Sequence, residues 1–200
     1  MSGFALRTAA DNPFSTRCVR PGAVPFLFPD DEDVQRLVGR LRERGWWGAV
    51  LGPHGSGKSA LLATLVEALK RLPRRVLRVE LHDRERRLPD HARRTLARDP
   101  PEQLVVDGYE QLGRLARWRL RRTCRRRGLG LLVSAHRPVG LPELYRTRVD
   151  LDLARRLVEH LQAGYEPHVA GDDVVVAHGR HGDNLRELLF ALYDLYESRR

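Results

Sequence analysis

The stretch at residues 51–59, LGPHGSGKS, constrains the fold of this chain more than any other. It matches the pattern GxxxxGK[ST] at every fixed position. Glycines such as Gly55 and Gly57 lack a Cβ, so they let the backbone curl until several N–H groups point at one anion. The pattern therefore predicts a phosphate-binding loop. Its residues are Gly52, Pro53, His54, Gly55, Ser56, Gly57, Lys58, Ser59 and Ala60.

The segments on either side of this loop support the prediction. Residues 46–51, WWGAVL, form an apolar run of strand length, and the residues after Ser59 repeat leucine and valine at helical spacing. A strand, a glycine loop and a helix in this order place phosphates at the helix N-terminus, where free N–H groups and the dipole attract anions. We expect Lys58 to reach the β- and γ-phosphates and the Ser59 hydroxyl to hold Mg²⁺. The alternative is a glycine-rich turn without a ligand.

The composition limits the class of protein. The formal net charge is +10, yet the only lysines are Lys58 and Lys70, so the charge reflects a preference for arginine more than a particular partner. Cys18 and Cys124 are isolated and favour neither a disulfide framework nor a zinc site. No apolar run approaches the length of a membrane span and residues 1–15 lack a signal-peptide core, so we expect a cytoplasmic protein.

The first third of the chain otherwise offers few chemical signals. Residues 1–30 show no sustained period and predict an extended arm. Within this arm, residues 25–28, PFLF, either pack against the core or line a pocket for a base: Pro25, Phe26, Leu27 and Phe28. A helix is expected over residues 31–42, a second strand over residues 76–81, and one short helix between loops over residues 83–101.

A second signal lies at residues 102–112, EQLVVDGYEQL. The short apolar run ends in Asp107, whose carboxylate we expect at the carboxyl edge of the sheet, facing the phosphate loop. This pattern resembles a Walker B motif, whose aspartate holds Mg²⁺, usually through water. A second acid commonly follows directly, but here Gly108 takes that place and Glu110 comes three residues after Asp107. Glu110 is either the residue that activates the attacking water or an ordinary carboxylate at a helix start.

Residues 109–127 predict a helix with Leu112, Leu115, Ala116, Leu120 and Cys124 on its packed side. The remaining positions are rich in arginine. They form either a solvated outer face or a basic ridge for nucleic acid or an acidic partner. The arginines are Arg114, Arg117, Arg119, Arg121, Arg122, Arg125, Arg126 and Arg127.

The last third contains two further signals. Residues 128–138, GLGLLVSAHRP, predict a buried strand that ends in polar residues, among them Ser134 and His136. A turn or short helix and then an alternating strand through Val149, Leu151 and Leu153 should follow. Helices are expected over residues 154–162, around residues 174–177 and over residues 184–198, the last containing the sequence DNLREL.

Four features together resemble the AAA+ superfamily of ATPases and its STAND relatives. They are the phosphate loop, the Asp107 strand, the polar-ended strand within residues 128–138 and the sequence GDNLREL. The spacing from Asp107 to Glu110 is similar to the DGLDE form of NACHT-type signalling ATPases. This resemblance implies an α/β P-loop NTPase fold with a central parallel sheet in the order 5-1-4-3-2 and a small C-terminal helical lid. It also implies three parts, which are an arm at residues 1–30, a core at residues 31–153 and a lid at residues 154–200.

The resemblance implies roles as well. ATP and Mg²⁺ are the expected ligands, with Ser59 and Asp107 at the metal. His136, or alternatively Ser134, corresponds to the residue that senses the γ-phosphate from the end of the strand within residues 128–138. Arg186 corresponds to the residue that senses it from the lid. Arg146 and Arg148, just ahead of the expected fifth strand, match the position of an arginine finger that reaches a neighbouring subunit.

The sequence leaves three functions open. The first is a Mg²⁺-dependent ATPase or nucleotide-controlled switch, with Lys58, Glu110, His136 and Arg186 as its catalytic residues. The second is a P-loop kinase for a small molecule, although the arginine-rich segment precedes the third strand instead of following it. The third is an ATP-dependent assembly factor bound to nucleic acid through the basic ridge. A homo-oligomer or a protein partner is compatible with the first and the third.

Overall fold

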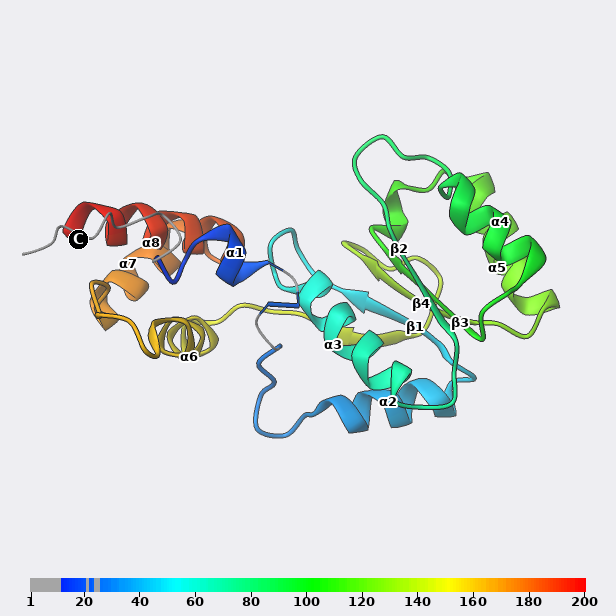
Figure 1. Cartoon of the computed structure of the whole chain (residues 1–200), viewed down its shortest axis with the longest axis horizontal. Coiled ribbons are helices and arrows are strands. Elements are labelled where there is room, and N and C mark those ends of the chain that lie inside the picture. Colours follow the sequence, from blue (N-terminus) through cyan, green and yellow to red (C-terminus); the bar gives the residue numbers. More distant parts are fainter. Residues whose placement is uncertain (1–11, 21, 24–25) are drawn as a thin grey trace, which may run out of the picture. The chain divides into compact units, whose positions relative to one another are not determined.

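A computed structural model describes residues 12–20, 22–23 and 26–200. The chain divides into two compact units (Figure 1). The sheet unit consists of Phe28–Gly52 and Lys58–Thr147, and the helical unit consists of the described residues up to Leu27, the loop segment Pro53–Gly57, and Arg148–Arg200. The expected division into arm, core and lid stays a prediction.

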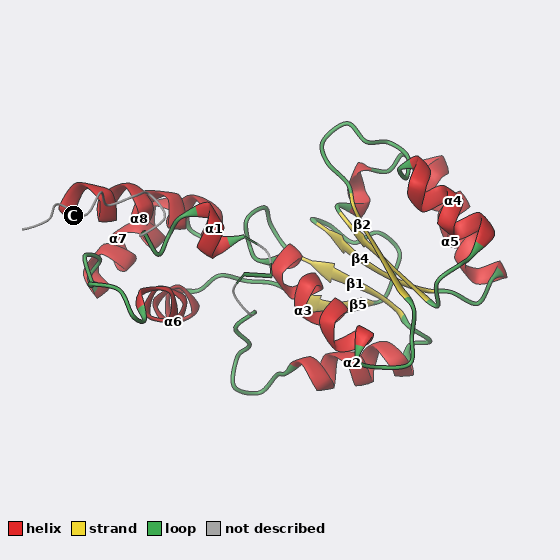
Figure 2. Ribbon diagram, in the orientation of Figure 1, coloured by secondary structure: helices red, strands yellow, loops and turns green. Residues whose placement is uncertain are grey.

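The sheet unit is built on five parallel strands (Figure 2). Their order is β2-β3-β4-β1-β5, so β1, which leads into the phosphate loop, has a neighbour on each side. This arrangement confirms the predicted order 5-1-4-3-2. The strands are β1 (Trp47–Leu51), β2 (Val76–Glu80), β3 (Gln103–Asp107), β4 (Gly130–Ala135) and β5 (Glu143–Arg146).

Helices cover both faces of this sheet because its strands are apolar on both sides. Ala92 and Leu96 of α4 and Leu120 and Cys124 of α5 pack into one core with alternate residues of the strands. Two further helices lie across the opposite face (Figure 2). The four helices are α2 (Val34–Glu43), α3 (Lys58–Lys70), α4 (Asp90–Arg98) and α5 (Arg114–Arg126).

The helix expected over residues 109–127 begins later than predicted. Tyr109–Gln111 forms a single 3₁₀ turn, and α5 starts only at Arg114, after Gly113 at its N-cap. Leu115, predicted to be packed, is 59% exposed, so that part of the prediction is wrong.

The fifth strand also differs from the prediction. β5 occupies Glu143–Arg146, ahead of the expected Val149–Leu153 alternation, and residues from Leu151 onward are helical. The side chain of Asp150 accepts a hydrogen bond from the Leu153 backbone N–H at 2.8 Å, which caps α6. An N-cap therefore outweighs the strand-like alternation of VDLDL.

The helical unit packs three long helices and an N-terminal segment around its own core. The three long helices are α6 (Leu151–Gln162), α7 (Gly171–His181) and α8 (Leu185–Arg199), and the N-terminal segment contains the short α1 (Thr16–Val19). Within the arm that the sequence predicts as extended, Thr16–Val19 is helical instead, and Phe14 is buried edge-on against Tyr196 of α8. Asn12 fastens the same segment by donating to the Tyr193 carbonyl and the Glu197 carboxylate.

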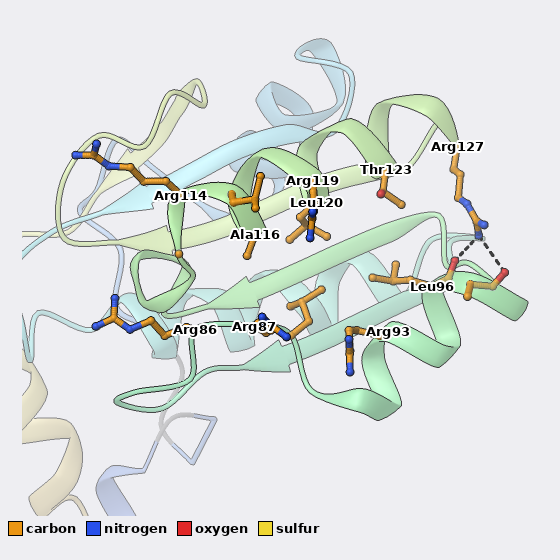
Figure 3. A pocket seen from close by; sticks show the side chains of 14 residues that line it. Arg86, Arg87, Arg93, Leu96, Arg114, Ala116, Arg119, Leu120, Thr123 and Arg127 are labelled. Atoms are coloured by element: carbon orange, nitrogen blue, oxygen red, sulfur yellow. Dashed lines mark hydrogen bonds between the residues drawn. The ribbon is translucent and has the colours of Figure 1, made fainter.

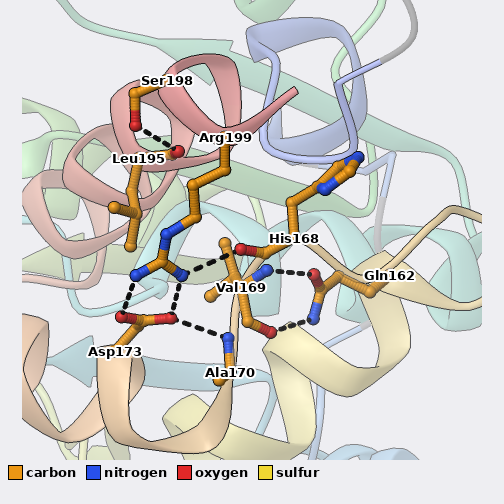
Figure 4. Close-up of polar contacts among 8 residues, drawn as sticks. All are labelled: Gln162, His168, Val169, Ala170, Asp173, Leu195, Ser198 and Arg199. Atoms are coloured by element: carbon orange, nitrogen blue, oxygen red, sulfur yellow. Dashed lines mark hydrogen bonds and ion pairs between the residues drawn. The ribbon is translucent and has the colours of Figure 1, made fainter.

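Polar contacts tie the end of α8 to the start of α7 (Figure 4). The Arg199 guanidinium pairs with both oxygens of Asp173 and donates to the His168 carbonyl at 3.0 Å. Asp173 also accepts from the Ala170 backbone N–H at 2.8 Å. The Arg199 hydrogen bond lowers the pKa of the Asp173 carboxyl below its ordinary value.

In the described part of the chain, none of the helices has the length and apolar character that a membrane span requires.

Candidate functional site

The phosphate loop follows β1 and leads into α3, as the sequence predicts. Gly55 and Gly57 have positive φ angles of 70° and 89°, and Ser56 donates to the Pro53 carbonyl at 2.8 Å. Lys58 is only 8% exposed, and its Nζ donates to the Gly52 carbonyl at 2.9 Å. Pro53 and His54 are exposed, and Ser59 and Ala60 are half-buried in the first turn of α3.

Asp107 ends β3, which the parallel sheet places at the same edge as the end of β1. Its side chain is buried, and Oδ1 accepts a hydrogen bond from the Ser134 hydroxyl at 2.5 Å. Ser134 lies on the neighbouring strand β4 and also accepts from the Gly108 N–H at 2.8 Å. Ser134 thus holds the Asp107 carboxylate and the backbone after it in place.

The second oxygen of Asp107 is buried without a hydrogen-bond partner among the described residues. No described residue donates a hydrogen bond to Oδ2, and the nearest cation is Arg78 Nη2 at 3.6 Å. A buried carboxylate oxygen in this condition costs free energy unless water or a cation binds it. Carboxylate and hydroxyl oxygens are the ligands that Mg²⁺ prefers, so Asp107 and Ser59 fit the predicted metal.

His136, just beyond β4, connects two predicted site residues. Its Nδ1 lies 3.4 Å from Lys58 Nζ, and its Nε2 lies 2.6 Å from Glu110 Oε1. One half-buried imidazole therefore contacts the phosphate-loop lysine and the acid after the Asp107 strand. Residues separated by 78 positions in the chain, Lys58 and His136, are brought together by the sheet order.

Gly108, which follows Asp107, has a backbone conformation that disfavours any other residue. Its φ is +75°, and a Cβ added there would lie 2.7 Å from the Leu81 carbonyl oxygen. A side chain at this position would strain the backbone and press against Leu81, the residue that follows β2. Glu110 lies inside the 3₁₀ turn that follows.

The start of α8 lies beside the phosphate-loop segment within the helical unit. A Cβ on Gly55 would meet Asn184 Oδ1 at 1.9 Å and Arg186 Cβ at 3.4 Å, so only glycine fits there. Asn184 is the N-cap of α8 and accepts from the Glu187 N–H at 3.4 Å. Arg186 follows in the first turn and is exposed. In the same unit, a Cβ on Gly57 would lie 3.5 Å from the ring of Phe26, whereas Pro25 lies outside the described residues.

The two candidate finger arginines occupy different settings. Arg146 ends β5 instead of preceding it, and both its Nε and Nη2 bind the Glu143 carboxylate. That contact raises the pKa of the Arg146 guanidinium, mainly through the hydrogen bond. Arg148 is exposed between β5 and α6. A finger role for either residue stays a prediction.

Sequence reasoning overlooked Arg78, the cation beside Asp107. It occupies the middle of β2, and its partner in register on β3 is Val105. A charged residue inside the otherwise apolar run VLRVE was the signal that could have identified it. The role of Ser134 as a bridge between Asp107 and Gly108 depends on strand register, which no local pattern reveals.

Comparisons with known proteins agree on the fold. Neither a protein-family model nor a curated protein sequence matches the chain. A solved DNA replication initiation factor is similar, with a TM-score of 0.55 and 13% identity over 79% of this chain and 58% of its own. The replication initiator DnaA bound to AMPPCP and single-stranded DNA has a TM-score of 0.55 and 14% identity over 86% of this chain and 63% of its own.

A third structure, AMPPCP-bound DnaA from Aquifex aeolicus, has a TM-score of 0.53 and 12% identity, and the match covers 84% of this chain and 61% of that one. The chain thus spans about three fifths of the length of these structures. At such low identity the likeness concerns the fold. The match and the sheet order together show that this chain has a P-loop NTPase fold, which it shares with these solved structures.

Proposed function

We propose that the chain binds ATP with Mg²⁺ and acts as an AAA+-type ATPase or nucleotide-controlled switch. The contact of His136 with both Lys58 and Glu110 carries this proposal. It joins the residue expected at the γ-phosphate to the residue expected at the attacking water. The bound AMPPCP in two similar structures supports a nucleotide ligand of this kind.

Each residue then has a defined task. Lys58 and the loop N–H groups bind the β- and γ-phosphates, and Ser59 and Asp107 hold Mg²⁺. When bound, that ion supplies charge neutralisation. Glu110 orients a water for attack on the γ-phosphorus, and the bond from this phosphorus to the β–γ bridging oxygen breaks to leave ADP and phosphate. His136, and Arg186 from the helical unit, respond to the γ-phosphate through its charge.

Two substitutions test the proposal, and the second of them is a matched control. Lys58→Ala should abolish binding of a fluorescent ATP analogue, because a buried ammonium at the phosphates is lost. Lys70→Ala removes the only other lysine, which is exposed at the end of the same helix, and should leave binding unchanged. Equal binding by all three proteins would exclude a nucleotide site at the loop.

A third variant separates binding from hydrolysis. Glu110→Gln should keep the affinity for ATP within about threefold while turnover falls by about 10²–10³-fold, as expected when a catalytic base is removed. Normal hydrolysis by this variant would show that another group orients the water. Phosphate release in buffer alone, with no acceptor added, distinguishes an ATPase from a small-molecule kinase.

The assembly state is a separate part of the proposal. Size-exclusion chromatography with light scattering on the Glu110→Gln protein, with and without ATP, measures it directly. Nucleotide-driven assembly would support an AAA+ machine, with an exposed arginine such as Arg148 available to a neighbour. A constant monomer would support a solitary switch.

A further inference from the structure

A groove lies on the sheet unit, away from the phosphate loop in sequence. Its volume is about 620 Å³, and its walls come from α5 on one side and from α4 with the loop ahead of it on the other (Figure 3). All the lining residues belong to residues 86–127 of the sheet unit. Three arginines of the predicted basic ridge, Arg114, Arg119 and Arg127, therefore belong to one wall of a cleft between two helices.

The groove concentrates positive charge. Six arginines line it and no acidic residue does, as far as the described part of the chain extends. Arg127 closes one end by donating to the backbone carbonyls of Leu96 and Ala97, and Arg93 pairs with Asp90 at the edge. No contact within the described residues engages the other four guanidinium groups. These four are Arg86, Arg87, Arg114 and Arg119.

Aliphatic side chains lie between these charges. Leu88, Leu96, Ala116 and Leu120 contribute to the lining, and Leu115 is 59% exposed beside them. Large exposed aliphatic side chains next to a concave surface are typical of protein interfaces. Leu115 therefore faces outward, where a partner could cover it.

We propose that this groove docks an acidic, leucine-containing peptide segment of a partner protein. Carboxylates suit the arginines, since each planar guanidinium can bind a carboxylate through two parallel hydrogen bonds. Apolar anchors of the segment would cover Leu88 and Leu115 between those contacts. A nucleic acid suits the lining less well, because none of the described lining residues is an aromatic on which a base could stack. The proposal does not depend on the nucleotide function.

Fluorescence anisotropy with defined probes tests the proposal on the full chain. The probe is a labelled peptide of about twelve residues that alternates pairs of aspartate or glutamate with leucine, the length of a typical docked segment. A second peptide replaces each leucine by serine, and a third probe is single-stranded oligothymidine of matched charge. We expect a Kd of about 1–100 µM for the leucine peptide and binding at least about tenfold weaker for the other two.

Matched variants locate the site. Arg87→Glu with Arg119→Glu reverses one charge on each wall and should weaken binding of the leucine peptide at least about tenfold. Arg98→Glu with Arg126→Glu makes the same charge change on α4 and α5 at exposed positions outside the groove, and should weaken it much less. Leu115→Ser, at an exposed position, should weaken the leucine peptide and leave the serine peptide unaffected.

Three results would overturn the proposal. Equal binding of the serine and leucine peptides would reduce the effect to net charge. Equal losses in the two double variants would remove the groove from the interaction. Tighter binding of oligothymidine, in competition with the leucine peptide, would assign the groove to single-stranded nucleic acid instead.

Discussion

The imidazole of His136 lies with Nε2 2.6 Å from Glu110 Oε1 while its Nδ1 lies 3.4 Å from Lys58 Nζ. A single side chain thus contacts both ends of the proposed reaction path. Because the imidazole ring of His136 is rigid, a movement of Lys58 upon phosphate binding would also displace Glu110. In the proposed function, His136 is therefore the residue that would couple nucleotide binding to water activation.

The first prediction concerns that coupling. His136→Ala should lower ATP turnover by about 10–100-fold, because Glu110 loses the partner that orients it, while the affinity for ATP changes by less than about threefold. Phosphate release and titration with a fluorescent analogue measure the two quantities. His160→Ala, at an exposed position at the end of α6, is the control. Loss of affinity in step with turnover would make His136 a binding residue instead.

The second prediction concerns the support of Asp107. Ser134→Ala removes the donor to Asp107 Oδ1 and the acceptor for the Gly108 N–H, and should destabilise the sheet unit by about 1–3 kcal/mol. All three tryptophans, Trp46, Trp47 and Trp118, lie in this unit, so tryptophan fluorescence during urea unfolding reports on it. Thr95→Ala, which removes a helical hydroxyl bonded to its own helix, should cost almost nothing. Equal losses would mean that the Ser134 network contributes little.

The third prediction concerns Gly108. Gly108→Ala should destabilise the sheet unit by about 1–3 kcal/mol, because φ is +75° and the new Cβ would lie 2.7 Å from the Leu81 carbonyl oxygen. Gly39→Ala, in the interior of α2 with open space around it, should stabilise the unit by up to about 1 kcal/mol. Urea unfolding of both variants gives opposite signs if the backbone constraint at Gly108 is real.

The fourth prediction uses the two cysteines. Burial raises the pKa of the Cys124 thiol to about 12, so at about pH 8 only about one in 10⁴ of these thiols is a thiolate. Cys18 is half-buried and should react with DTNB in the folded protein, whereas Cys124 should react only after the sheet unit unfolds. The Cys18→Ser variant isolates the second thiol. Rapid labelling of that variant without denaturant would contradict the packing of α5.

The fifth prediction is a pH dependence in the helical unit. The Arg199 hydrogen bond lowers the pKa of Asp173, so this contact stabilises the fold above the ordinary carboxyl pKa and is lost as the pH falls through the lowered value. Arg199→Gln should speed amide exchange in α7 and α8 at about pH 7, and the difference from wild type should shrink as the pH falls through the lowered pKa of Asp173. Hydrogen exchange read by mass spectrometry, at matched pH for both proteins, measures it. A difference that persists in acid would assign the effect to the His168 carbonyl contact.

Most of the sheet could be predicted because its signals are local. The phosphate loop fixes a strand before it and a helix after it, and buried runs such as residues 104–106 stand out against the charged background. Lys58 and Asp107 could be placed for the same reason. Their roles with nucleotide and metal stay predictions.

The remaining features depend on competition or on distance. Asp150 can cap a helix or begin an alternating strand, and only the packing of α6 decides in favour of the cap. Leu115 is exposed because of its spacing within α5: it precedes Cys124 by nine residues, which at about 100° per residue puts the two on opposite sides of the helix. The double contact of His136 requires two strands to be neighbours, and no window of sequence contains that information.

The order of the strands in the sheet differs from the order in which the ribosome makes them. β1 is flanked by β4 and β5, which the ribosome makes long after the phosphate loop has emerged. Until β4 is available, the nascent chain presents an apolar strand with both edges open, and one edge stays open until Arg146 has been made; such edges recruit other chains. Partial translation products that stop before residue 130 should therefore aggregate or occupy chaperones, and the two neighbours of β1 are the last strands of the sheet unit to be completed.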